Sequence, residues 1–223
     1  MTKKRIGTMA ACLALVGAVA VGGTLALLSN KSNIATNTFT VGNGYPEEIS
    51  LELTEANVKQ DLHGNYVQGD GRKEATDFTL EYPKVVAGTN LYKDPTFDLV
   101  EGSPDSWVVA RISEVDEAFV GSNFDDENGW YKVIEKDGTY TATPVEANTP
   151  ITASLYIYGQ IVNDASTISP LFTNLDVIPG LKDDATIDDM VINGCAVQAV
   201  GDNVTDVNDA VDAVVKVAVE KGL

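Results

Sequence analysis

The sequence predicts a mainly β protein, a β-sandwich that ends in one α-helix. Three observations support this prediction: short segments in which apolar and polar residues alternate, turn residues between those segments, and a helical pattern confined to the end of the chain. Many short strands separated by turns are typical of a sandwich. Hydrophobic residues make up 44% and charged residues 22% of the 223 residues, which is an ordinary balance for a folded domain.

The N-terminus has the pattern of an export signal. A basic region, Lys3-Lys4-Arg5, precedes a mainly apolar run over residues 6–28. The run contains the small-x-small pattern Thr24-Leu25-Ala26, so we expect a signal peptidase to cut between Ala26 and Leu27. A membrane anchor is the alternative, because the run is long enough to span a bilayer. The expected units are a signal peptide (1–26), an N-terminal strand or donor arm (27–45) and one sandwich domain (46–223).

Period-2 alternation predicts the strands that follow. The alternating segments are residues 38–41, 49–54, 78–81, 107–112, 155–162 and 190–200. The segment 155–162 is largely apolar on both faces, which indicates a central strand. Turn residues separate these segments at Gly42-Asn43-Gly44, Gly69-Asp70-Gly71, Glu127-Asn128-Gly129, Lys136-Asp137-Gly138 and Pro179-Gly180.

The tail has a different period. Val207, Val211, Val214, Val215 and Ala218 follow helical spacing, and either Thr205 or Asp206 is placed to cap the first turn. These positions predict a helix over about 206–221. Valine is a middling helix former, so we expect contact with the sandwich to hold this helix in place.

Charge and cysteine content limit the function classes. The net charge is −18, from 15 basic and 33 acidic residues. A chain with this charge is repelled by nucleic acids and by anionic membrane surfaces. Cation binding, high solubility and a location outside the cell are the interpretations that remain open. Removal of the signal peptide would also remove Cys12 and leave Cys195 alone. Because Cys195 lies in an apolar strand pattern, we expect a buried, inert thiol.

Several segments, in order, resemble a known family. Residues 23–29 and 35–43 are similar to a SipW-type signal peptide and first strand of the TasA/camelysin family, exported proteins of Gram-positive bacteria. The later matches are Val86-Ala87-Gly88, Lys93-Asp94-Pro95-Thr96, Ser106-Trp107-Val108-Val109-Ala110-Arg111, Trp130-Tyr131, Pro170-Leu171-Phe172 and Ala196-Val197-Gln198-Ala199. Cys195 departs from the family, which commonly has an aromatic residue there.

The resemblance implies a jelly-roll-like antiparallel sandwich and a non-enzymatic role in the cell-surface or biofilm matrix. It implies that subunits assemble into fibres when the freed N-terminal segment of one completes a sheet of the next. The donor candidates are Thr38, Phe39, Thr40 and Val41, within the released segment 27–41. The alternative is that these residues pair within their own subunit. Expected partners are further copies, matrix or cell-wall components, and signal peptidase during export, with membrane contact only before cleavage.

Two other functions stay open: an exported metal-dependent protease like camelysin, and a monomeric surface adhesin or binding module. A helical zinc protease needs two histidines one turn apart and a glutamate base, whereas the single histidine here is His63, in the turn-like Leu62-His63-Gly64-Asn65. We therefore expect no catalytic residues and an exposed loop histidine. Trp107, Trp130, Tyr156 and Tyr158 are expected in the core or at an interface.

Acid-rich segments are weak candidates for calcium. Asp125 and Asp126 lie before Glu127-Asn128, and Asp183 and Asp184 precede a second acidic pair, Asp188-Asp189. Oxygen clusters of this kind suit hard cations. None has the full twelve-residue calcium loop, so a solvated acidic surface is the expected reading, with no other cofactor.

Overall fold

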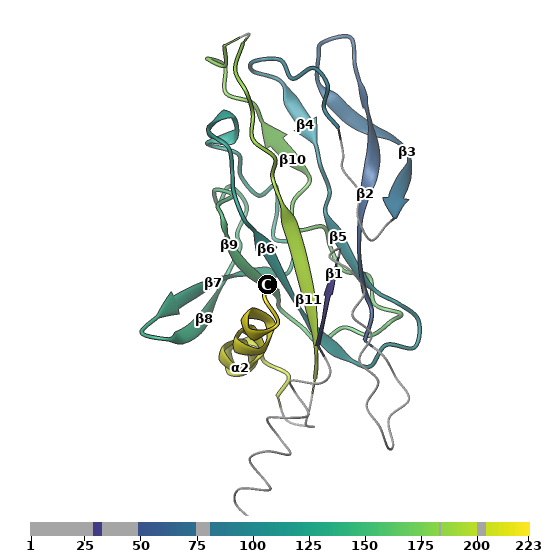
Figure 1. Ribbon diagram of the computed structural model, residues 1–223, viewed down its shortest axis with the longest axis vertical. Helices are drawn as coiled ribbons and strands as arrows, with labels where there is room; N and C mark the ends of the chain where they lie inside the picture. Colours follow the sequence, from purple (N-terminus) through teal and green to yellow (C-terminus); the bar gives the residue numbers. More distant parts are fainter. Residues whose placement is uncertain (1–28, 33–48, 75–80, 183, 200–203) are drawn as a thin grey trace, which may run out of the picture.

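The computed structural model describes residues 29–32, 49–74, 81–182, 184–199 and 204–223. Within these residues the chain forms two β-sheets and a C-terminal helix (Figure 1), so the prediction of a mainly β protein ending in a helix is confirmed. Over the same ranges, no helix is long and apolar enough to cross a membrane.

Two sheets form the two layers of the molecule. The six-stranded sheet contains, in spatial order, β1 (Ser29–Ser32), β11 (Ile192–Gln198), β6 (Ser106–Ile112), β9 (Ser154–Tyr158), β7 (Trp130–Lys136) and β8 (Thr139–Pro144). The five-stranded sheet contains β10 (Asn174–Asp176), β4 (Asn90–Tyr92), β3 (Tyr66–Glu74), β2 (Leu51–Gln60) and β5 (Thr96–Leu99). A short 3-10 helix, Glu117–Phe119, follows β6.

Almost all neighbouring strands pair in the antiparallel direction. All neighbours in the six-stranded sheet are antiparallel. In the other sheet, β3 and β4 pair in parallel through Tyr66 and Leu91, and the remaining pairs are antiparallel. A parallel neighbour needs a crossover of about a dozen residues, and the chain between β3 and β4 is long enough. The sandwich is thus mixed rather than wholly antiparallel, and its jelly-roll connection stays a prediction.

Apolar residues from both sheets share one core between the layers. Leu53 of β2 and Phe97 of β5 belong to the same buried cluster as Val108 of β6 and Tyr156 of β9. The rings of Phe97 and Trp130 lie with centroids 5.9 Å apart. Successive residues of a strand point to opposite faces of its sheet, so these side chains lie on the two faces that meet inside the sandwich.

A second cluster fills the space between the other face of the six-stranded sheet and the helix α2 (Val207–Glu220). Trp107 and Val109 of β6 face α2, whereas Val108 and Ala110 face the sandwich core. Strand β6 is therefore buried on both faces, and so is β9, the predicted central strand. The prediction that Trp107, Trp130, Tyr156 and Tyr158 are core residues is confirmed.

The helix is the element that the sequence predicts most closely. Its N-cap is Asp206, whose carboxylate accepts a hydrogen bond of 2.9 Å from the amide of Asn208. The valines at helical spacing, with Ala210 and Ala218, are buried in the second cluster. Burial of this stripe explains how a valine-rich segment stays helical.

The hairpin of β7 and β8 closes on a two-residue turn. Asp137 and Gly138 both have positive φ, 52° and 75°, which is the type I′ geometry that suits the twist of a hairpin. The turn predicted at Lys136-Asp137-Gly138 is confirmed. Figure 1 shows this hairpin projecting sideways from the sandwich, close to α2.

One predicted turn is wrong. Gly69-Asp70-Gly71 lies inside β3, where the pairing with β2 shifts register between Ala56 and Val58. Gly71 has a φ of 78°, and the side chain of Asn57 donates to the carbonyl of Asp70 at 2.9 Å. The glycines therefore form a bulge instead of reversing the chain, because a bulge also needs a residue that tolerates positive φ.

Candidate functional site

Strand β1 is the outermost strand of the six-stranded sheet and pairs only along β11. The antiparallel register joins Ser29 to Val197, Asn30 to Ala196, Lys31 to Cys195 and Ser32 to Gly194. The sequence of β1 is wholly polar, whereas Cys195, Ala196 and Val197 are each 0% exposed. A short polar segment therefore covers the edge of an apolar, deeply buried strand.

The edge of β11 needs such a cover. Its other side is taken up by β6 along the whole strand, from Ile192 to Gln198. If β1 left, β11 would present unpaired N–H and C=O groups on a β-prone strand, which is the kind of edge that recruits another strand. The segment that fills this edge begins at Ser29, shortly after the predicted cleavage site at Ala26.

Most residues that the sequence assigns to export and donation lie outside the described residues. These are the cleavage residues Thr24, Ala26 and Leu27 and the donor candidates Thr38, Phe39, Thr40 and Val41. The strand observed in the released segment, Ser29–Ser32, is not among the donor candidates. Ser-Asn-Lys-Ser has neither alternation nor high β propensity, so only its place directly after the leader marks it.

The described calcium candidates lie in two separate loops. Asp125 and Asp126 lie with Glu127 around a surface cavity of about 160 Å³ in the loop before β7. The Asp125 carboxylate accepts hydrogen bonds from the Thr173 hydroxyl and the Asn174 amide. Asp184 lies in the loop before β11, and Asp183 is outside the described residues. Among the residues that the structure describes, no three His, Cys, Asp or Glu side chains are grouped to hold a metal ion.

His63 and Cys195 lie where the sequence indicates. His63 is exposed in the turn between β2 and β3, where its amide donates to the Asp61 carboxylate at 2.8 Å. Cys195 is fully buried in the cluster under α2. The predicted exposure of His63 and the predicted burial of Cys195 are confirmed.

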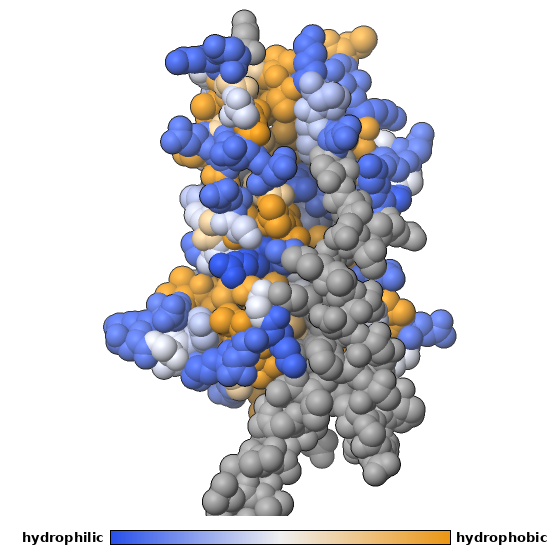
Figure 2. Space-filling model, in the orientation of Figure 1, coloured by the Kyte–Doolittle hydropathy of each residue, from blue (hydrophilic) through white to orange (hydrophobic). Residues whose placement is uncertain are grey.

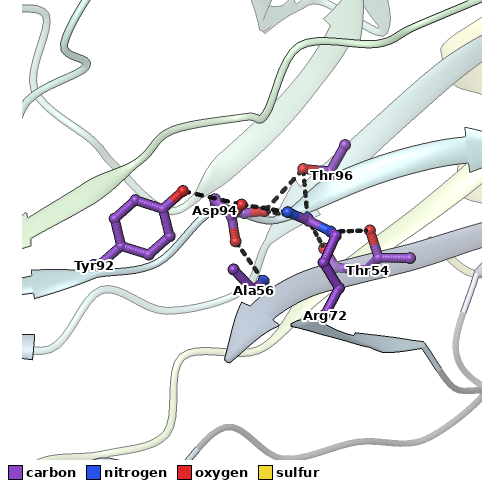
Figure 3. Close-up of polar contacts among 6 residues, drawn as sticks. All are labelled: Thr54, Ala56, Arg72, Tyr92, Asp94 and Thr96. Atoms are coloured by element: carbon purple, nitrogen blue, oxygen red, sulfur yellow. Dashed lines mark hydrogen bonds and ion pairs between the residues drawn. The ribbon is translucent and has the colours of Figure 1, made fainter. Parts of the chain in front are cut away.

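A buried polar network is the feature that sequence reasoning missed. Asp94, 3% exposed, accepts from Arg72 Nη1 at 2.6 Å and from the amide of Ala56 at 2.7 Å (Figure 3). The Arg72 guanidinium also donates to the Thr54 hydroxyl at 3.1 Å and to the Thr96 hydroxyl at 3.0 Å. The network fixes the residues that follow β4 against β2 and β3.

A second ion pair adjoins this network. Lys93 Nζ contacts both carboxylate oxygens of Glu55, at 2.7 and 2.9 Å, and Glu55 is 3% exposed. Lys93 and Asp94 belong to the Lys93-Asp94-Pro95-Thr96 segment, whose only sequence signal is the family resemblance. Lys93 and Asp94 are neighbours in the loop after β4, and they thus pair with β2 and β3 respectively.

Tyrosines around the two ion pairs stay protonated. Burial raises the pKa of the Tyr82 phenol far above its usual range, and the charges of Glu55 and Asp94 raise it further. Burial, followed by the charge of Asp94, also raises the pKa of Tyr92, whose hydroxyl donates to Asp94 at 3.2 Å. Because the acceptors and donors satisfy one another, this arrangement positions the loop that follows β4.

Comparison with protein-family models, with curated proteins and with solved structures finds no match for this chain.

Proposed function

We propose that this protein is an exported, non-enzymatic cell-surface or biofilm-matrix protein that assembles when β1 of one copy pairs with β11 of the next. The observation that supports the proposal is the register of β1 on β11 at the edge of the six-stranded sheet. The resemblance of the N-terminal block to the TasA/camelysin family supports export and matrix location. Trimming before Leu27 would leave β1 close to a free chain end.

Exchange of β1 between copies conserves the pairing that the single chain already makes. Each β11 edge keeps one polar partner strand, and each chain gives its own β1 to a neighbour, as in domain swapping. Residues 33–48 link β1 to the sandwich, and an extended chain of that length reaches up to about 55 Å. The balance between the closed single chain and the assembly then depends on protein concentration, because each junction immobilises one more copy.

A cysteine placed opposite Cys195 tests the proposal. Lys31 pairs with Cys195, and paired residues of antiparallel strands have Cα atoms close enough for a disulfide. We expect the secreted Lys31→Cys protein, after mild oxidation, to give a ladder of covalent multimers on a non-reducing gel. The ladder should collapse on reduction, and electron microscopy of the unmodified protein should show fibres.

Ser29→Cys is the matched control, because it adds a thiol to the same strand opposite Val197 rather than Cys195. It should form far fewer cross-links at the same concentration. A Lys31→Cys protein that closes into disulfide-bonded monomers at every concentration would contradict strand donation. N-terminal sequencing of the secreted protein tests the other premise, since a retained leader would exclude release of β1.

A further inference from the structure

The second edge of the six-stranded sheet is β8, and it is protected in a different way from the β11 edge. Strand β8 pairs with β7 on one side only, from Thr139 opposite Lys136 to Pro144 opposite Tyr131. In an antiparallel pair, alternate residues turn their N–H and C=O groups away from the partner strand. The amide of Tyr140 donates to a side chain of α2 instead of to β7. The backbone N–H and C=O groups of Tyr140 therefore point away from β7, and by alternation those of Ala142 do so too.

The sequence of β8 gives it little protection of its own. Thr-Tyr-Thr-Ala-Thr-Pro has no charged residue, and threonine and tyrosine favour strands. Thr139, Thr141 and Thr143 are exposed. Natural edge strands are usually protected by lysines, bulges or prolines, and uncharged β-prone segments readily pair with copies of themselves. Pro144 protects only the end of β8, since it lacks an N–H group.

Helix α2 supplies the missing protection through Asp212. Asp212 Oδ1 accepts the Tyr140 amide at 2.9 Å, and Oδ2 contacts Lys216 Nζ at 2.8 Å. The hydrogen bonds from Lys216 and from the Tyr140 amide hold the pKa of the Asp212 carboxyl below its usual range, so it stays an ionised acceptor. Burial of Val211 and Val215 in the second cluster fixes the helix that bears Asp212.

We propose that Asp212 is an edge guard, which blocks antiparallel pairing of β8 with β8 of a second copy by occupying the Tyr140 amide. A carboxylate at this position also puts two like charges together when two such edges approach, which disfavours the pairing further. In Figure 2 the far end of the β7–β8 hairpin is hydrophilic. The inference does not depend on strand donation at β11, because the two edges lie on opposite sides of the sheet.

Two substitutions of Asp212 separate the effect of its hydrogen bond with the Tyr140 amide from the effect of its charge. Asp212→Ala removes the acceptor, whereas Asp212→Asn keeps a carbonyl oxygen for the Tyr140 amide and removes the charge. We expect Asp212→Ala to associate at about tenfold lower protein concentration than the unmodified protein. Asp212→Asn should lie between the two. Light scattering after size-exclusion chromatography measures the association. Every variant retains the same β11 edge, so association through that edge is the same in all of them.

Two control variants test whether loss of an acid from α2, or loss of the ion pair with Lys216, is enough to change the association. Asp209→Ala removes an exposed acid from the same helix, and Lys216→Ala removes the ion pair but leaves Asp212. Both should associate like the unmodified protein. Amide exchange at Tyr140 should quicken in monomeric Asp212→Ala, and circular dichroism should show that its helix persists.

A suppressor identifies the surface that associates. Ala142→Pro removes an outward N–H group without removing a bond to β7, so it should return Asp212→Ala to the behaviour of the unmodified protein. Equal association of Asp212→Ala and the unmodified protein, with a folded helix, would overturn the proposal. Association of the Asp212→Ala/Ala142→Pro double variant at the same low concentration as Asp212→Ala would overturn it as well, because the added contact would then lie elsewhere than at β8.

Discussion

Arg72 and Asp94 form an ion pair of 2.6 Å that joins β3 to the loop between β4 and β5. The Asp94 side chain is 4% exposed and that of Arg72 is 34% exposed, so the acid is the buried partner. A second oxygen of Asp94 accepts the amide of Ala56, next to the bulge where β2 and β3 change register. The pair therefore stabilises the part of the sheet in which regular strand pairing is interrupted.

Loss of the Asp94 carboxylate should destabilise the fold. Asp94→Ala leaves the buried Ala56 amide without an acceptor, which costs about 1–3 kcal/mol. Chemical denaturation monitored by tryptophan fluorescence measures the free energy of unfolding. Asp70→Ala, an exposed acid in the same bulge, is the control and should change that free energy by no more than about 0.5 kcal/mol. An equally small effect of Asp94→Ala would show that the network does not stabilise the bulge.

The buried pair of Lys93 and Glu55 should respond in a strongly non-additive way. Lys93→Met leaves the Glu55 carboxylate buried without a partner and should lower the free energy of unfolding by about 3–5 kcal/mol. Glu55→Leu in addition removes the unpaired charge, so the double variant should recover most of the loss. A double-mutant cycle by urea denaturation measures the coupling. Simple addition of the two single effects would argue against a direct interaction.

A cross-strand pair of acids should weaken the edge of the five-stranded sheet at neutral pH. Glu52 lies opposite Asp98, and burial raises the pKa of Asp98 although Arg72 lowers it. A raised carboxyl pKa destabilises the fold above that pKa, so stability should rise as the pH falls through it. Asp98→Asn should raise the free energy of unfolding at neutral pH by about 0.2–1 kcal/mol. The gain should vanish in acid, where Asp98 is protonated, and Glu52→Gln in the Asp98→Asn background should add little.

Alkaline pH should unfold the protein through its buried tyrosines. Burial raises the pKa of Tyr82 and of Tyr156, so both stay protonated in the fold while the unfolded chain ionises above about pH 10. The contribution of these two tyrosines to stability should therefore be constant below that pH and fall above it. Tyr82→Phe should flatten the fall, and Tyr140→Phe, outside the network, is the control. Ultraviolet absorbance of tyrosinate should rise together with unfolding, and tyrosinate formation in a folded protein would contradict the prediction.

Local patterns in the sequence are enough for several elements. The stripe of valines from Val207 to Val215 predicts α2, because helical period and burial coincide there. Asp137-Gly138 predicts the hairpin turn, because its positive φ values are a local requirement. Alternation predicts β6, whereas the finding that Trp107 faces a helix and Val108 faces the other sheet needs both neighbours in place.

Long-range packing decided the rest. Ser29–Ser32 is a strand because β11 offers an open edge, and nothing in the four residues themselves favours one. Gly69-Asp70-Gly71 is a bulge because β2 continues beside it, although the same residues suit a turn. Asp94 meets Arg72, and Asp212 meets Tyr140, across distances in the chain that no periodicity encodes. Local backbone preference and the burial pattern are enough to predict the strand-rich class and the terminal helix from the residues alone. The sheet edges and the buried charges depend on which backbone and side-chain groups meet after the sheets and the helix have packed, so they can be found in the folded chain but not in the pattern of its residues.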